Sequence, residues 1–210
     1  LSHNTGKHMT LSSERSVGMG QMIIRRAELT PDAPALTYEG TTLTFAELAH
    51  RVRRIACLLR ALNIESGDRV GYLGQNHPRF LEVLYASSLI GAIFVPINYR
   101  LTAQEVSFIA NDSVLKLLFA DQFSAHLIEP PGKAFSCERL ISIDFNATGW
   151  EVLDTALASK VLEHAIQEFL VEPVSENDIA LIMYTSGTTG RPKGALLSHG
   201  NIFWNLYYKS

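Results

Sequence analysis

The chain has 210 residues, 47% of them hydrophobic and 19% charged, with a formal net charge of −3. This balance is typical of a globular core, excludes a disordered chain, and argues against nucleic acid or an anionic membrane as a partner. The two cysteines, Cys57 and Cys137, lie far apart without C-x-x-C spacing. That spacing argues against a zinc site or a disulfide scaffold and predicts a reducing, cytoplasmic location. The longest apolar stretch, residues 84–97, is too short to span a bilayer, so we expect no transmembrane segment.

Residues 1–18 show no periodicity, and we expect a disordered leader or a remnant of expression there. Thr44 followed by Glu47 forms a capping-box pattern, and the apolar residues behind it recur at spacings of three and four. This pattern predicts an amphipathic helix over residues 44–62. The outer face of that helix is basic, and we interpret it as solvated rather than as a ligand site. Its residues are His50, Arg51, Arg53, Arg54 and Arg60.

Strands and helices alternate along the rest of the chain. Short apolar runs predict strands at residues 69–73, 92–97, 115–120, 140–143 and 178–184. Helical spacing predicts helices at residues 80–90, 102–110 and 162–169 and from residue 201 onwards, with a Pro-Gly loop at 129–132. The alternation predicts an α/β fold, with a mostly parallel sheet and helices on both faces. Ligands bind beyond the carboxyl ends of the strands in such sheets.

Residues 184–194, Y-T-S-G-T-T-G-R-P-K-G, combine hydroxyl side chains, glycines and one lysine. Glycine lets backbone N–H groups approach an anion closely, hydroxyls donate hydrogen bonds, and lysine supplies a compensating charge. This mixture predicts a phosphate-binding loop. A P-loop of the NTPase type is excluded, because Pro192 stands where its second glycine should be and Gly194 follows Lys193 in place of Ser or Thr.

The run T-S-G-T-T-G-R-P-K-G resembles the phosphate-loop signature of the adenylate-forming, or AMP-binding, ligases. Residues 43–48, L-T-F-A-E-L, and 89–98, L-I-G-A-I-F-V-P-I-N, are similar to that superfamily's first two core motifs and occur in the same order. Residues 98–105 resemble fatty-acyl and aryl CoA ligases more than peptide-synthetase domains. The resemblance implies that residues 19–210 form the first part of the large N-terminal domain of an acyl-CoA synthetase-like fold, without its C-terminal domain.

The implied activity is an ATP-dependent acid–thiol ligase. A carboxylic acid, which we expect to be a fatty acid, would be activated as an acyl-adenylate and transferred to coenzyme A. The magnesium ligand and the catalytic lysine are expected beyond residue 210, so we assign no catalytic or metal-binding residue within this chain and expect it to be inactive alone. His199 is a minor candidate for the site. The residues assigned to the ATP phosphates are Thr185, Ser186, Gly187, Thr188, Thr189, Gly190 and Lys193.

Two other interpretations stay open. One is an amino-acid adenylation domain of a peptide synthetase, against which residues 98–105 weigh. The other is a non-catalytic nucleotide-binding or interaction module that uses the half-fold as a scaffold. The sequence leaves the acyl chain length and the oligomeric state open.

Overall fold

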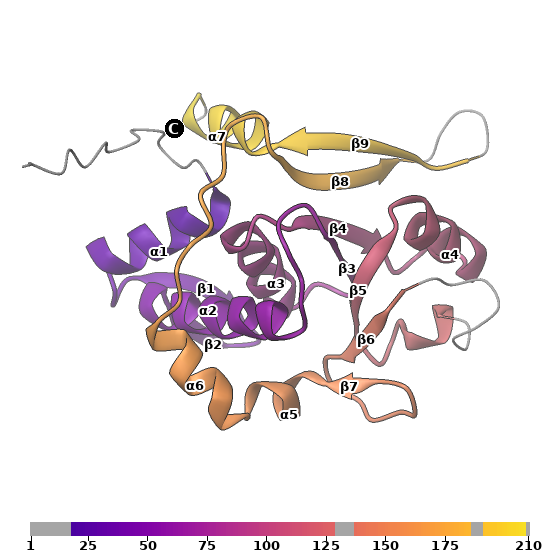
Figure 1. Cartoon of the computed structure of the whole chain (residues 1–210), viewed down its shortest axis with the longest axis horizontal. Coiled ribbons are helices and arrows are strands. Elements are labelled where there is room, and N and C mark those ends of the chain that lie inside the picture. Colours follow the sequence, from indigo (N-terminus) through magenta and orange to yellow (C-terminus); the bar gives the residue numbers. More distant parts are fainter. Residues whose placement is uncertain (1–17, 129–136, 186–190, 209–210) are drawn as a thin grey trace, which may run out of the picture.

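The computed structural model describes residues 18–128, 137–185 and 191–208. The leader expected at residues 1–18 thus lies, but for Gly18, outside the described residues, and so does the loop expected at 129–132. Figure 1 shows a central sheet with helices packed beside it. A separate antiparallel hairpin precedes α2, and its strands are β1 (Pro34–Tyr38) and β2 (Thr41–Thr44).

The main sheet has seven strands in the order β7-β6-β5-β3-β4-β8-β9. The first six run parallel to one another, and β9 closes the edge antiparallel to β8. The predicted mostly parallel α/β fold is therefore confirmed. In chain order the strands are β3 (Arg69–Gly74), β4 (Ile93–Asn98), β5 (Leu115–Ala120), β6 (Arg139–Ser142), β7 (Glu151–Val152), β8 (Ile179–Thr185) and β9 (Lys193–Ser198).

Side chains that alternate along the buried strands build one core on each face of the sheet. On β4, Phe94 joins the core under α2 and α3, whereas the next residue, Val95, joins the core under α4. Helices therefore cover both faces, as the alternation of elements predicts. The helices are α1 (Met19–Leu29), α2 (Phe45–Ala61), α3 (Pro78–Leu89), α4 (Ala103–Asp112), α5 (Leu153–Leu157), α6 (Lys160–Gln167) and α7 (His199–Tyr207), with a short 3₁₀ turn at Ala125–Leu127.

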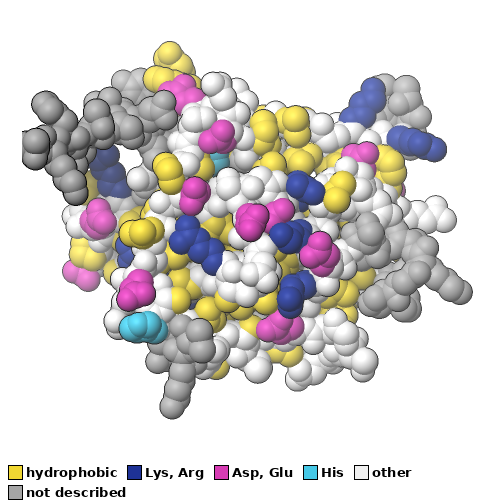
Figure 2. Space-filling view, in the orientation of Figure 1, with side chains coloured by type: hydrophobic (Ala, Val, Ile, Leu, Met, Phe, Trp, Pro, Cys, Tyr) yellow, Lys and Arg dark blue, Asp and Glu magenta, His cyan; other side chains and the backbone are white. Residues whose placement is uncertain are grey.

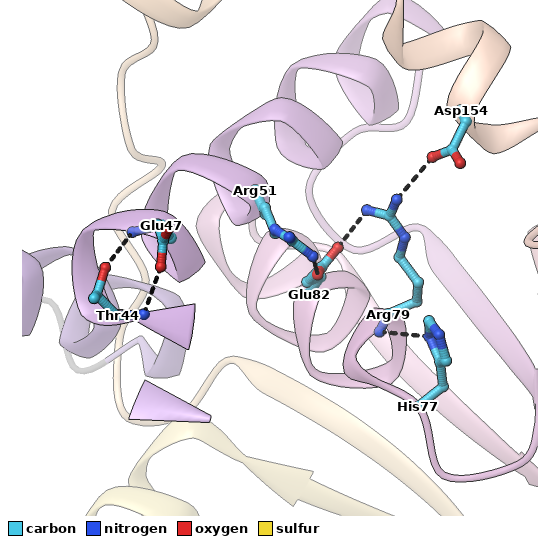
Figure 3. Close-up of polar contacts among 7 residues, drawn as sticks. All are labelled: Thr44, Glu47, Arg51, His77, Arg79, Glu82 and Asp154. Carbon is cyan, nitrogen blue, oxygen red and sulfur yellow. Dashed lines mark hydrogen bonds and ion pairs between the residues drawn. The ribbon is translucent and has the colours of Figure 1, made fainter. Parts of the chain in front are cut away.

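The capping box predicted at Thr44 is present, and a second one begins α4. The Thr44 hydroxyl accepts a hydrogen bond from the backbone N–H of Glu47, whose carboxylate accepts in return from the N–H of Thr44 (Figure 3). Thr102 and Glu105 repeat the arrangement at the start of α4. Each box satisfies two backbone donors that a helix start leaves unpaired.

A buried carboxylate joins α2 to α3. Glu82 on α3 has no exposed side-chain surface and accepts from Arg79 at 2.6 Å and from Arg51 of α2 at 3.4 Å. Arg79 also reaches Asp154 on α5 at 2.7 Å, so Figure 3 shows one guanidinium between two carboxylates. The network ties three helices together, because a buried charge is tolerated only when it is paired.

The basic outer face of α2 is less solvated than predicted. Besides Arg51, Arg54 donates to the carbonyl of Leu157 at 2.8 Å, and the guanidinium of Arg60 lies over the ring of Phe169. Periodicity along α2 cannot reveal the segment of α5 and α6 that packs there from more than ninety residues away. Figure 2 shows acidic and basic side chains interspersed on the viewed face.

Candidate functional site

The predicted phosphate loop connects β8 to β9 at the end of an antiparallel hairpin (Figure 1). Residues 186–190 lie outside the described residues, so the positions predicted for Ser186, Gly187, Thr188, Thr189 and Gly190 stay predictions. The two described members of the set, Thr185 and Lys193, are the last cross-strand pair before the loop. Residues directly opposite each other in an antiparallel pair share a face of the sheet. A hydroxyl and an ammonium group, both on exposed residues, therefore lie side by side where the hairpin ends.

The position of this pair agrees with the rule for parallel sheets. β8 runs parallel to β4, and Thr185 is its last residue, so the loop leaves from the carboxyl ends of the parallel strands. Basic side chains flank the loop in Figure 2, at the end of the β8–β9 hairpin. An exposed lysine with a neighbouring hydroxyl fits an anionic phosphate, for which both supply donors.

The opposite face of the hairpin end is packed. Tyr184 precedes Thr185, and its hydroxyl donates to the Asp112 carboxylate at 2.6 Å. Gly194 faces Tyr184 across the hairpin, and a Cβ added there would lie 3.1 Å from Cζ of the tyrosine ring. Burial, reinforced by the Asp112 carboxylate, raises the pKa of Tyr184, so its phenol keeps its proton.

His199 does not join this pair. It follows Ser198 at the opposite end of β9, on the order of 15–20 Å along the strand from Lys193. Its side chain is buried, and neither ring nitrogen has a hydrogen-bond partner among the described residues. Burial lowers the pKa of the imidazole, while Asp178 opposes the shift. His199 therefore begins α7 as a neutral core residue.

The start of α7 is fixed by local polar contacts. The side chains of Ser198 and Asn201 each accept from the other's backbone N–H, which caps the helix. Gly200 approaches the chain so closely that an added Cβ would lie 2.8 Å from the carbonyl oxygen of Glu176. These contacts explain the S-H-G-N sequence as helix-start chemistry, without a ligand.

Backbone donors fill both oxygens of a carboxylate near the same edge of the sheet. Asp121 follows β5, and its two oxygens accept from the backbone N–H groups of Gln75 and Ser124 at 2.7 and 2.8 Å. Among the described residues, no group of three or more His, Cys, Asp or Glu side chains could hold a metal ion. In the same ranges, no helix is both long and apolar enough to cross a membrane.

Arg100 is a further cation near this edge, in the turn after β4. Its guanidinium lies 5.4 Å from the centre of the Tyr99 ring, and its backbone N–H donates to the side chain of Asn98. Tyr99 packs edge-on against Phe123 from the turn after β5. Residues 98–105 resemble those of fatty-acyl and aryl CoA ligases, and in the structure Tyr99 and Arg100 form an aromatic and cationic turn.

Comparison with known proteins agrees with the motifs. The family model for AMP-binding enzymes matches residues 23–209. The chain is 41% identical over 191 residues to a feruloyl-CoA synthase from Amycolatopsis sp, covering 91% of this chain and 35% of that protein. It is 34% identical over 187 residues to an indoleacetate–CoA ligase from Aromatoleum aromaticum, covering 89% of this chain and 36% of that protein.

A solved structure shares the fold. The structure of a Mycobacterium tuberculosis fatty acyl CoA synthetase aligns with a TM-score of 0.71 at 33% identity, covering 87% of this chain and 35% of the other. The chain thus spans about a third of the length of the relatives it matches. The match of the family model to residues 23–209 establishes that this chain belongs to the AMP-binding enzyme family.

Proposed function

We propose that the chain supplies the ATP phosphate-binding part of an acid–thiol ligase, which activates a carboxylic acid as an acyl-adenylate and transfers the acyl group to coenzyme A. The observation that carries the proposal is the pairing of Thr185 with Lys193 at the mouth of the loop. Membership of the family and its CoA-ligase relatives support it.

The chemistry that these residues would perform is electrostatic. When a carboxylate attacks the α-phosphate of ATP, the β- and γ-phosphates leave as pyrophosphate and gain charge. Hydroxyl and ammonium donors held in place beside those oxygens stabilise the leaving group without having to reorganise. Thr185 and Lys193, with the loop residues 186–190, are proposed to do this. Magnesium would neutralise further phosphate charge in the whole enzyme.

For the carboxylic acid substrate we propose only a chemical class, an aryl or a fatty acid. The relatives are named for feruloyl, indoleacetate and fatty acyl substrates, so aryl acids stand beside the fatty acid expected from the sequence. A protein that contains this chain and the remaining family motifs would separate the two classes in an assay of acid-dependent AMP release. The assay would compare ferulate and indoleacetate with fatty acids of graded length.

Binding to the chain itself gives the direct test. We expect pyrophosphate and ATP to bind, as measured by titration calorimetry, and Lys193→Ala to weaken both about tenfold or more, because a charge-assisted hydrogen bond is lost. Arg139→Ala is the matched control, since Arg139 is an exposed cation that begins β6 at the amino end of the sheet. Absence of binding by the unaltered chain, or equal losses in the two variants, would refute the phosphate-binding role.

A second assay addresses adenylation. We expect no carboxylate-dependent exchange of pyrophosphate into ATP from the 210-residue chain, because the resemblance places the magnesium ligand and the catalytic lysine outside it. Exchange above background would show that these residues suffice for the first half-reaction.

A further inference from the structure

We propose that Asp112 is a positioning residue for the Thr185–Lys193 pair at the end of the β8–β9 hairpin and that it acts through the hydroxyl of Tyr184. The inference rests on the proposed phosphate-binding function of the loop. Asp112 ends α4 and Tyr184 is the penultimate residue of β8, so residues 72 positions apart in the chain meet at the mouth of the loop.

The hydrogen bond itself is of a strong kind. The oxygen atoms of Tyr184 and Asp112 are 2.6 Å apart, the distance typical of a hydroxyl that donates to an ionised carboxylate. Such a bond fixes the orientation of the Tyr184 ring as well as the distance between the ring and the Asp112 carboxylate. It joins the hairpin end to α4, which packs through Val106 and Ile109 on a core face of the sheet.

Apolar packing and a polar contact hold this end of the hairpin together. β8 runs parallel to β4 and pairs with β9 as far as Thr185 and Lys193. Ile182 and Tyr184 pack in the core that β4 and α4 share on this face of the sheet. The hydrogen bond from Tyr184 to Asp112 adds a directional contact to that packing, next to the Thr185–Lys193 pair.

The ring is also held from its own hairpin. Gly194 faces Tyr184, and an added Cβ would lie 3.1 Å from the ring and 3.0 Å from Cγ2 of Ile182. The ring thus packs on the β9 backbone with Asp112 at its far end. Since side chains alternate along a strand, a fixed Tyr184 and Gly194 on one face fix the direction in which Thr185 and Lys193 leave on the other.

A double-mutant cycle tests the inference. Pyrophosphate and ATP affinities are measured by calorimetry on the 210-residue chain and on Tyr184→Phe, Asp112→Ala and the double variant. We expect each single variant to weaken binding by between about 2-fold and 30-fold, and the double variant to be no weaker than either single one. Asp112→Asn, which keeps an acceptor oxygen, should recover part of the loss seen in Asp112→Ala.

Two controls separate positioning from general stability. Thr44→Ala removes the cap of α2 at a distance from the loop, so it should lower resistance to urea and leave pyrophosphate affinity unchanged. Amide hydrogen exchange at Thr185 and Lys193 should accelerate in Tyr184→Phe and stay unchanged in Thr44→Ala. The second readout does not depend on a ligand.

The outcomes distinguish this inference from the proposed function. If the unaltered chain binds pyrophosphate and the Tyr184 and Asp112 variants bind it equally well, the positioning role is wrong and the phosphate site stands. If Lys193→Ala and Arg139→Ala behave alike, the proposed function fails, and the inference fails with it. Losses that add in the double variant would show that the two residues act separately and would also overturn the positioning role.

Discussion

Arg79 and Glu82, one helical turn apart on α3, form an ion pair of 2.6 Å in which the carboxylate has no exposed side-chain surface. The same guanidinium pairs at 2.7 Å with Asp154, whose side chain is 71% exposed. One cation thus serves a carboxylate that water cannot reach and another that water solvates well. The energetic value of the two contacts should differ accordingly.

We expect Arg79→Met to destabilise the fold by about 3–5 kcal/mol, because it removes the nearer partner of a buried charge. Asp154→Asn is the matched control and should cost less than about 1 kcal/mol, since exposed ion pairs contribute little. Urea unfolding followed by circular dichroism measures both. In a Glu82→Gln background the cost of Arg79→Met should fall sharply, and equal costs in the two backgrounds would contradict the assignment.

Gly20→Ala should destabilise the protein although alanine is the better helix former. In a free helix the change would stabilise by up to about 1 kcal/mol. Here an added Cβ would lie 2.4 Å from the backbone carbonyl oxygen of Tyr85 and 2.8 Å from Leu89, so α1 would have to move away from α3. Thermal unfolding of the two proteins shows whether Gly20→Ala lowers or raises the stability. An increase in Tm would show that the two helices are less closely packed than the structure indicates.

Protonation of His199 should weaken the fold. Its folded-state pKa lies below the ordinary 6.5, so the unfolded chain binds the proton more tightly. The contribution of neutral His199 to the free energy of unfolding is complete above about pH 6.5. It is lost as the pH falls toward the folded-state pKa, at up to about 1.4 kcal/mol per pH unit. Urea midpoints at pH 7.5, 6.5 and 5.5 should show a smaller pH dependence in His199→Gln. His164→Gln, at an exposed histidine, should retain the full dependence.

Cys137 should be a slow thiol. Burial raises its pKa from 9.0 to about 11, so about a hundredfold less thiolate is present at pH 8. Its rate with a disulfide reagent should therefore keep rising up to pH 10, where an ordinary thiol has levelled off. The variant Cys57→Ser leaves Cys137 as the single reacting thiol. The reaction of the unfolded chain in urea gives the rate of the same thiol when it is fully exposed. Rapid modification of the folded protein at pH 8 would contradict the burial of the thiol.

The central strands could be predicted because each is a continuous apolar run between turn signals, and β5 has the bounds that the pattern predicts. The helix expected at 80–90 begins earlier, at Pro78, where the ring of His77 accepts from the N–H of Arg79. Proline at the first helical position could have shown this start. Helix α7 likewise begins at His199, two residues before its expected start.

Other elements depend on contacts between distant segments. Helix α1 was not predicted, because Gly20 and two adjacent arginines obscure its apolar face, which forms against α3. β9 was not predicted either, since K-G-A-L-L-S has a weak strand pattern and pairs only because β8 lies beside it. The loop motif predicts where in the chain the candidate site lies. The facing of Thr185 and Lys193 and the contact with Asp112 depend on register and tertiary packing, which periodicity does not encode.

The position of β8 in the sheet also has a consequence for folding. β3, β4 and β5 are close in sequence and can pair early, whereas β8 must find β4 across the whole intervening segment of β5, β6, β7, α5 and α6. Closing so long a segment is entropically costly and slow. We therefore expect the β8–β9 hairpin to form locally and to dock last. A folding intermediate would then hold most of its hydrophobic core before the hairpin that carries the proposed phosphate site has docked.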